Sequence, residues 1–165
     1  MSNLSPARKL HDLLAKFDTA MLISRTPEGQ LRGRPMAVAH VDEDCQIWFF
    51  SSIESGKVHE IECDSHVSVV CQRHDLFLSL SGQAGVSRER AKMVELWKES
   101  FKPWFPRGPE DDGIALVSVK PSEGEYWDGE GFNKIKYLFQ TAHAFATGSP
   151  IRIEEGEQHA KVHLS

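Results

Sequence analysis

Two basic residues, Arg34 and Lys57, are the side chains whose type and spacing point most directly to chemistry. They lie on either side of a β-hairpin whose tip is the acidic run 42–44. Centring the hairpin on that tip places Arg34 opposite Ile53, within a residue or two, because pairing register follows the position of the turn. Lys57 follows in the first turn of a short helix predicted over 55–63. The spacing therefore brings both cations to the start of one helix.

Two cations at a helix N-terminus are unfavourable by themselves, because that end of the helix already carries a partial positive charge. An anion between them makes the arrangement favourable. Backbone N–H groups, the hydroxyls of Ser51, Ser52 and Ser55, a guanidinium and an ammonium together suit a phosphate group. In the alternative interpretation, Arg34 pairs with an Asp or Glu and Lys57 points to water. The residue pattern leaves both interpretations open.

Flat apolar side chains lie next to these cations, at Pro35, Met36, Phe49 and Phe50. A phosphate site beside a flat hydrophobic slot suits a mononucleotide-like ligand such as FMN. Successive residues of a strand face opposite ways, so one of the two phenylalanines is expected to face the core rather than the slot.

The elements that must position these residues follow from hydrophobic periodicity and turn residues. Strands are predicted over 19–26, 31–41, 46–51, 67–72, 76–86, 114–119, 125–127 and 159–164. Helices are predicted over 5–17, 55–63, 88–100 and 132–147. Pro35 inside a strand indicates an edge, a bulge or a barrel rim. Because most strands are hairpin neighbours, we expect a mainly β fold, in which an antiparallel sheet closes into a barrel with helices outside it.

The composition fits one globular domain over residues 1–165, with an N-terminal helix over 5–17 and a tail over 150–165. Lys and Arg number 19 and Asp and Glu 24, so the net charge of −5 argues against a nucleic-acid binder. The apolar runs fall short of the ~20 residues that a membrane helix needs, and the N-terminus lacks a signal-peptide pattern. The three cysteines include no C-x-x-C pair, so we expect reduced thiols in a cytoplasmic protein, with Cys71 in the core.

Motifs for several other chemistries are missing from the sequence, which contains no phosphate-binding P-loop, no H-E-x-x-H and no G-x-S-x-G. His159 and His163 have the spacing of a helical metal pair, but the alternation over 159–164 is that of a strand. We therefore expect a solvated strand edge there rather than a metal site. No side chain stands out as an acid or a base, so no catalytic residue is predicted.

The segments around the two cations resemble those that bind FMN in the pyridoxamine 5'-phosphate oxidase-like split-barrel superfamily. These segments are Gly33–Met36, Ile47–Ser52 and Ser55–Val58. Further segments are similar to those of its general stress protein 26-like subgroup, and they are Leu78–Gly82, Trp97, Trp104–Pro106 and Glu125–Asp128. The order and spacing of all these segments, over residues 10–148, carry the resemblance.

The resemblance implies a six-stranded split β-barrel and a homodimer that binds FMN at its interface. It also implies that Arg34 and Lys57 hold the FMN phosphate, with Ser51 and Ser55 as hydrogen-bonding helpers.

Four more residues receive roles from the resemblance alone. Pro35 and Met36 would present backbone groups to the flavin ring, and Phe50 would lie near the ribityl chain or the ring. Trp104 would cover the flavin from its aromatic loop, although a purely structural role for this residue stays open.

The chain departs from true pyridoxamine phosphate oxidases at two places. Ala39 stands where those enzymes have a substrate-binding lysine, and residues 160–165 lack their terminal Arg-x-His segment. The resemblance therefore implies an FMN-dependent oxidoreductase acting on a small molecule rather than a vitamin oxidase. Two alternatives stay open: a non-catalytic stress protein that stores flavin or senses redox state, and a split barrel that binds haem or a deazaflavin.

Overall fold

The structure of the chain is a computed structural model that describes residues 5–129, 146–148 and 159–164. The helix predicted over 132–147 lies outside the described residues except for its last two positions. In chain order the elements are α1 (Pro6–Leu14), β1 (Thr19–Arg25), β2 (Leu31–Val41), β3 (Ile47–Ser52), α2 (Gly56–Cys63), β4 (His66–Arg73), β5 (Leu76–Ser87), α3 (Arg90–Leu96), a 3-10 turn (Glu99–Phe101), β6 (Ile114–Asp128) and β7 (His159–His163).

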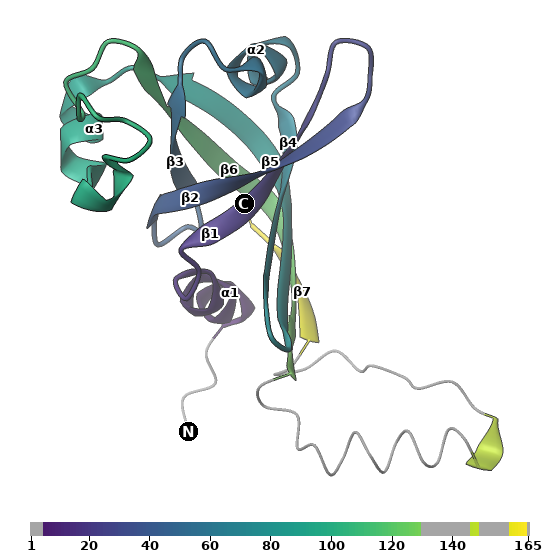
Figure 1. The fold of residues 1–165 in the computed structure, drawn as a ribbon. Helices are drawn as coiled ribbons and strands as arrows, with labels where there is room; N and C mark the ends of the chain where they lie inside the picture. The colour runs from purple at the N-terminus through teal and green to yellow at the C-terminus, as the bar shows by residue number, and fades with distance from the viewer. Residues whose placement is uncertain (1–4, 130–145, 149–158, 165) are drawn as a thin grey trace.

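The strands form one antiparallel sheet in the order β3-β2-β1-β4-β5-β6-β7. A further pairing of β3 with β6 closes the first six strands into a barrel, and β7 extends the sheet beyond it. Figure 1 shows α1 and α2 at opposite ends of the barrel and α3 to one side. The predicted six-stranded barrel with peripheral helices is confirmed.

Strand β6 corrects the sequence-based prediction of two separate strands over 114–119 and 125–127. It runs unbroken from Ile114 to Asp128. Between the two predicted segments the pairing with β5 shifts by one residue: Ser81 pairs with Glu123 and Gly82 with Pro121, which leaves Ser122 of β6 as the extra residue. Gly82 is required at this point, because a Cβ there would collide with the carbonyl oxygen of Lys120.

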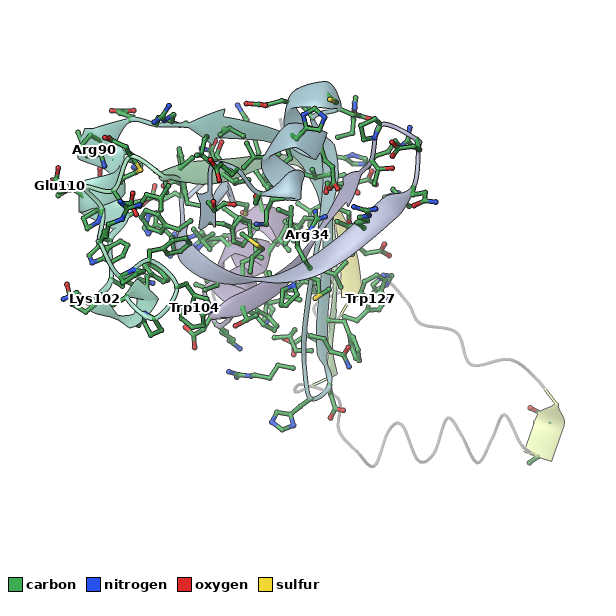
Figure 2. The ribbon with its side chains drawn as sticks, turned by 45° about the horizontal axis from the view of Figure 1, so that its top comes forward. Arg34, Arg90, Lys102, Trp104, Glu110 and Trp127 are labelled. Atoms are coloured by element: carbon green, nitrogen blue, oxygen red, sulfur yellow. The ribbon has the colours of Figure 1, made fainter. Side chains whose placement is uncertain are left out.

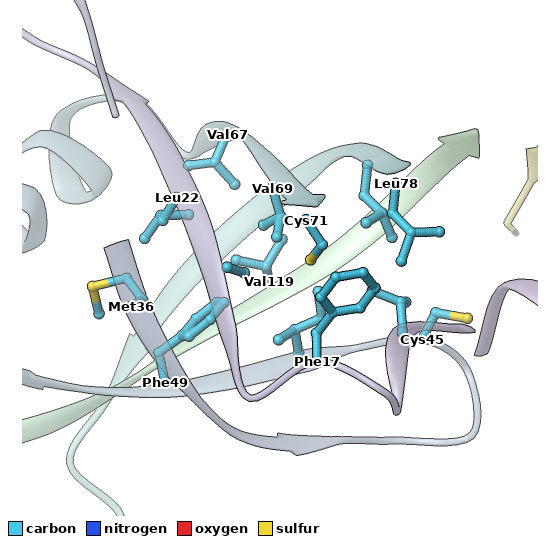
Figure 3. Packing of buried hydrophobic residues seen from close by; sticks show 14 of the residues in the cluster. Phe17, Leu22, Met36, Cys45, Phe49, Val67, Val69, Cys71, Leu78 and Val119 are labelled. Carbon is cyan, nitrogen blue, oxygen red and sulfur yellow. The ribbon is translucent and has the colours of Figure 1, made fainter. Parts of the chain in front are cut away.

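The barrel interior holds the larger hydrophobic core, which includes Phe49, Leu22, Val69 and Leu78, each at most 1% exposed. Figure 3 shows these side chains converging between the strands, together with Cys71, whose predicted core position is confirmed. Full burial of apolar side chains of this size is the main force that favours the closed barrel.

A smaller cluster lies outside the barrel, where α3 and the 3-10 turn pack against β3 and β6. Its buried members are Ala39, Phe50, Met93, Leu96, Phe101, Ile114 and Leu116. We refer to these residues, with the partly buried Trp97 and Phe105 that pack on them, as the aromatic cluster.

Helix α1 begins where the sequence predicts, since the Ser5 hydroxyl accepts a hydrogen bond from the Arg8 N–H and Pro6 occupies the first turn. It ends at Leu14 rather than at residue 17. Its buried leucines join the barrel core. Within the described residues, no helix has the length and apolar character needed to span a membrane.

Candidate functional site at the split between two strands

The candidate site lies where strands β2 and β3 separate. Their pairing runs from Val41–Ile47 to Val38–Phe49, with a bulge on the way, and stops there. The Val38–Phe49 pair has the register predicted from the hairpin tip. From Leu31 to Ala37, β2 pairs with β1, and no described residue pairs with its other edge. Pro35 lies in this singly paired segment, as expected for a residue without a backbone N–H.

Beyond the split, Lys57 is surrounded by hydroxyl groups. Its Nζ donates to Ser51 Oγ at 3.0 Å and to Ser55 Oγ at 3.2 Å, and these two oxygens lie 3.0 Å apart. Ser55 is the N-cap of α2, yet its side chain makes no capping hydrogen bond. None of the ion pairs between described residues includes Lys57. The ammonium therefore faces neutral acceptors at a helix start.

Arg34 is held from behind by a buried carboxylate. Its Nη2 donates to Glu60 Oε2 at 2.9 Å and its Nη1 to Ser24 Oγ at 2.5 Å, while Ser24 Oγ donates to Glu60 Oε2 at 2.5 Å. Ser24 is fully buried and Glu60 is 3% exposed. Arg32 Nη1 lies 3.6 Å from Glu60 Oε1. The alternative interpretation of the sequence is thus correct in one part, since Arg34 pairs with an acidic residue.

Sequence reasoning did not single out Glu60. The available signal was helical spacing: Glu60 follows Lys57 by three residues on α2, so both side chains lie on one face of a short helix. A carboxylate at that position faces the arginine of the neighbouring strand.

The surroundings of the site shift the pKa values of the two charged residues of α2, Lys57 and Glu60. Burial lowers the pKa of Lys57, and the positive charge of Arg34 lowers it further, while Glu60 opposes the shift. For Glu60, burial raises the pKa, but hydrogen bonds from Ser24 and Arg34 and the charges of Arg34 and Arg32 outweigh burial and hold it below its usual value. The carboxylate is therefore firmly ionised, whereas the lysine is an ammonium that gains from a nearby anion.

The structure brings Lys57, Ser51 and Ser55 into contact, and Arg34 lies close enough for its charge to act on Lys57 while its own hydrogen bonds go to Ser24 and Glu60. Met36, on the same strand segment, is 7% exposed and directs its side chain into the barrel core, while Pro35 is exposed. Arg34, Pro35 and Met36 are thus neighbours on the segment of β2 that does not pair with β3.

Phe50 and Trp104 lie elsewhere. Phe50 is 5% exposed and packs in the aromatic cluster, with its ring 5.2 Å from that of Phe101. Trp104 is 68% exposed and lines a pocket of about 350 Å³ together with Ser52 and Glu54. Figure 2 shows Trp104 on the loop that follows α3, on the side of Lys102, and Arg34 on β2. Their predicted contacts with flavin stay predictions.

The sequence of this chain is similar to those of known proteins. Residues 5–151 match the sequence profile of the family described as pyridoxamine 5'-phosphate oxidase like. Protein bli-3 of Neurospora crassa is 24% identical over 164 residues, which cover 90% of this chain and 78% of that protein.

Solved structures share the fold. A Jannaschia protein assigned as general stress protein 26 is 24% identical with a TM-score of 0.70, covering 94% of this chain and 96% of that one. General stress protein 26 of Bacillus anthracis is 20% identical with a TM-score of 0.66, covering 73% and 92%.

Two further proteins with this fold are described as binding a cofactor. One is an FMN-binding protein of Nostoc punctiforme related to pyridoxamine 5'-phosphate oxidase, 15% identical with a TM-score of 0.56, covering 79% of this chain and 87% of that one. The other is a haem-binding protein of Mycobacterium smegmatis, 11% identical with a TM-score of 0.60, covering 76% and 55%.

Proposed function

Because the chain belongs to the pyridoxamine 5'-phosphate oxidase like family, we propose that it binds FMN at the split between β2 and β3 and acts as an oxidoreductase on a small molecule. The observation that carries this proposal is that Lys57 donates to two serine hydroxyls at the start of α2, with Arg34 close enough for its charge to lower the pKa of Lys57.

The donor set fits the phosphate of FMN. Arg34 uses two of its five N–H donors on Ser24 and Glu60, which leaves three for a ligand. Lys57 has hydroxyl partners that it can share with a phosphate, and Ser55 leaves the helix N–H groups free of its side chain. Charge-assisted hydrogen bonds of this kind are about twice as strong as neutral ones.

The flavin ring would lie along the free edge of β2. There the backbone groups of Pro35 and Met36 are not paired with β3, so they are open to the polar rim of a flat ring. Bound FMN supplies the electron-transfer chemistry, and the protein's part is to hold the phosphate, orient the ring and tune it.

The proposal excludes pyridoxamine phosphate oxidation as the main activity. Ala39, which takes the place of the substrate lysine, is 2% exposed and packs in the aromatic cluster. A side chain there points away from the barrel interior and from the hydroxyls around Lys57. We expect pyridoxal phosphate formation by FMN-loaded protein to stay well below the ~1 s⁻¹ of an ordinary enzyme.

The test is the visible spectrum of the purified protein, followed by titration of flavin fluorescence. We expect a flavin spectrum and tighter binding of FMN than of riboflavin, which lacks the phosphate. A haem or deazaflavin spectrum would contradict the proposal. Stopped-flow reduction by NADH or NADPH then separates an oxidoreductase from a protein that stores flavin, since storage requires no rapid reduction.

We also propose a homodimer in which Trp104 lies at the interface. Trp104 is 68% exposed, and aromatic side chains such as tryptophan are enriched where subunits meet. Symmetric dimers are the commonest closed assembly, and a ligand that contacts both subunits stabilises the dimer by mass action. Sedimentation with and without FMN tests this. A monomer that binds FMN, with mass and affinity unchanged by Trp104→Ala, would contradict the interface.

A cytoplasmic location is part of the same proposal. Cys45, Cys63 and Cys71 are free thiols, as a reducing compartment would keep them.

A further inference from the structure

Among the described residues, Glu60 carries the one carboxylate in direct contact with Arg34, and it is buried. We propose that Glu60 is an internal counter-ion: it occupies Arg34 in the flavin-free protein and limits how strongly the site attracts a phosphate. This inference rests on the proposed function, since it concerns the affinity of the same site for FMN.

The position of Glu60 suits a counter-ion and not a ligand contact. Its side chain is 4% exposed, whereas that of Arg34 is 22% exposed, so the arginine lies between the carboxylate and solvent. Both of its hydrogen-bond donors, Ser24 and Arg34, approach the same oxygen, Oε2. A phosphate that reaches Arg34 and Lys57 therefore meets the cations first and feels the carboxylate behind them as a repulsive charge.

The net charge of the site also supports a counter-ion role for Glu60. Arg32, Arg34 and Lys57 contribute three positive charges, and Glu60 removes one, which leaves a net charge of +2. A phosphate monoester carries about −1.5 to −2 near neutral pH, so the site as built is matched to a single phosphate group. Without Glu60 the local charge would be +3, and the attraction for an anion would increase.

The same carboxylate stabilises the protein when no ligand is bound. Removing one partner of a buried ion pair leaves the other charge without compensation, which is strongly destabilising. Glu60 therefore trades phosphate affinity against the stability of the flavin-free fold, as is common for functional sites.

The experiment compares FMN and riboflavin binding to the wild type and to Glu60→Gln, which keeps the shape of the side chain and removes its charge. We expect the ratio of FMN affinity to riboflavin affinity to rise by about tenfold, because only FMN carries the phosphate. We also expect the melting temperature of the flavin-free variant to fall. The matched control is Glu62→Gln on the same helix, where the side chain is exposed and the ratio should change far less.

A second pair of variants keeps the test valid if Glu60→Gln folds poorly. Arg34→Met leaves Glu60 facing the phosphate with less compensation, whereas Arg34→Met with Glu60→Gln removes both charges of the pair, a change that proteins often tolerate. We expect the double variant to bind FMN more tightly than Arg34→Met does.

Two results separate the inference from the proposed function. If the wild type binds FMN but Glu60→Gln leaves the FMN-to-riboflavin ratio unchanged or lower, the counter-ion role is wrong while the flavin site stands. If the wild type shows no preference for FMN over riboflavin, the phosphate site itself is wrong, and the role of Glu60 fails with it.

Discussion

The two faces of strand β3 have different surroundings. Side chains alternate along a strand, so Phe49 and Ser51 face one way and Phe50 and Ser52 the other. On the first face, Phe49 belongs to the barrel core and Ser51 meets Lys57 and Ser55. On the second face, Phe50 belongs to the aromatic cluster and Ser52 lines the pocket beside Trp104.

This contrast shows how a short strand can carry the candidate site next to well-packed apolar side chains. The polar side of β3 begins where pairing with β2 ends, so hydroxyls and cations lie next to free backbone groups. The opposite side is packed with rings, and Phe50 contacts Trp97 at a centroid distance of 5.5 Å and Phe101 at 5.2 Å. We therefore expect binding to depend on the Ser51 end of the first face, and folding stability to depend on Phe49 of that face and on Phe50 of the other.

The largest expected effect is on the aromatic face. Phe50→Ala removes a 5%-exposed ring from the cluster and should lower the free energy of unfolding by about 3–5 kcal/mol. The folded Phe50→Ala variant should keep its preference for FMN over riboflavin, since Lys57 and its serine partners lie on the other face of β3. Denaturant unfolding and flavin titration measure both quantities.

The matched control for that change is Phe77→Ala on β5, where the ring is 40% exposed and the loss of stability should be clearly smaller. A loss of FMN preference in folded Phe50→Ala would instead support the predicted contact of Phe50 with the flavin, and it would break the division between the faces.

The next effect is on the polar face. Lys57→Ala removes charge-assisted contacts worth about 1.5–3 kcal/mol, so FMN should bind about ten- to a hundredfold more weakly. Folding stability should change little, because the half-buried ammonium makes hydrogen bonds to hydroxyls but no ion pair with a described carboxylate. Lys161→Ala, on the half-exposed surface of β7, is the control and should leave FMN affinity unchanged. An equal loss in both variants would point to general charge and not to a site.

Much of this arrangement follows from local sequence signals. The pairs β1–β2, β2–β3 and β4–β5 are hairpins bounded by turn residues, so their positions and the register at Val38–Phe49 can be predicted from the chain itself. The predicted register does not extend to Arg34: the β2–β3 pairing ends at Val38–Phe49, so Arg34 does not pair with Ile53 and instead pairs with Leu22 of β1 and contacts Glu60 of α2.

The remainder depends on contacts between segments far apart in the sequence. Strand β6 stays continuous past Pro121 because the pairing with β5 shifts by one residue at Ser122. Pro121 is a local sign of such a shift, but the partner that keeps the strand paired, Gly82, comes from β5. The burial of Phe50 depends on α3 and on Phe101, about fifty residues later in the chain. Glu60 gains its role from Ser24 and Arg34, which two other strands supply.

The smallest expected effect is a pH dependence that belongs to Lys57. Its pKa lies below the ordinary 10.5, first because of burial and then because of Arg34, so the ammonium loses its proton at a lower pH than an exposed lysine does. FMN affinity should therefore fall severalfold as pH rises through that lowered pKa. It should also fall below about pH 6, where the phosphate takes up a proton. Between these limits, Glu60 stays ionised because its pKa is lowered, so it adds no step.

The sign of the stability change distinguishes Lys57 from other groups that titrate at alkaline pH. A lysine whose pKa is lowered by folding binds fewer protons in the folded than in the unfolded state, so stability rises as pH increases through this window. Flavin-free protein should thus become slightly more stable while FMN affinity declines. In Lys57→Ala both slopes should disappear, and flavin titration and denaturant unfolding over the alkaline range would show it. If the variant kept the same alkaline decline in affinity, the titrating group would lie elsewhere and the polar face of β3 would lose its assigned cation.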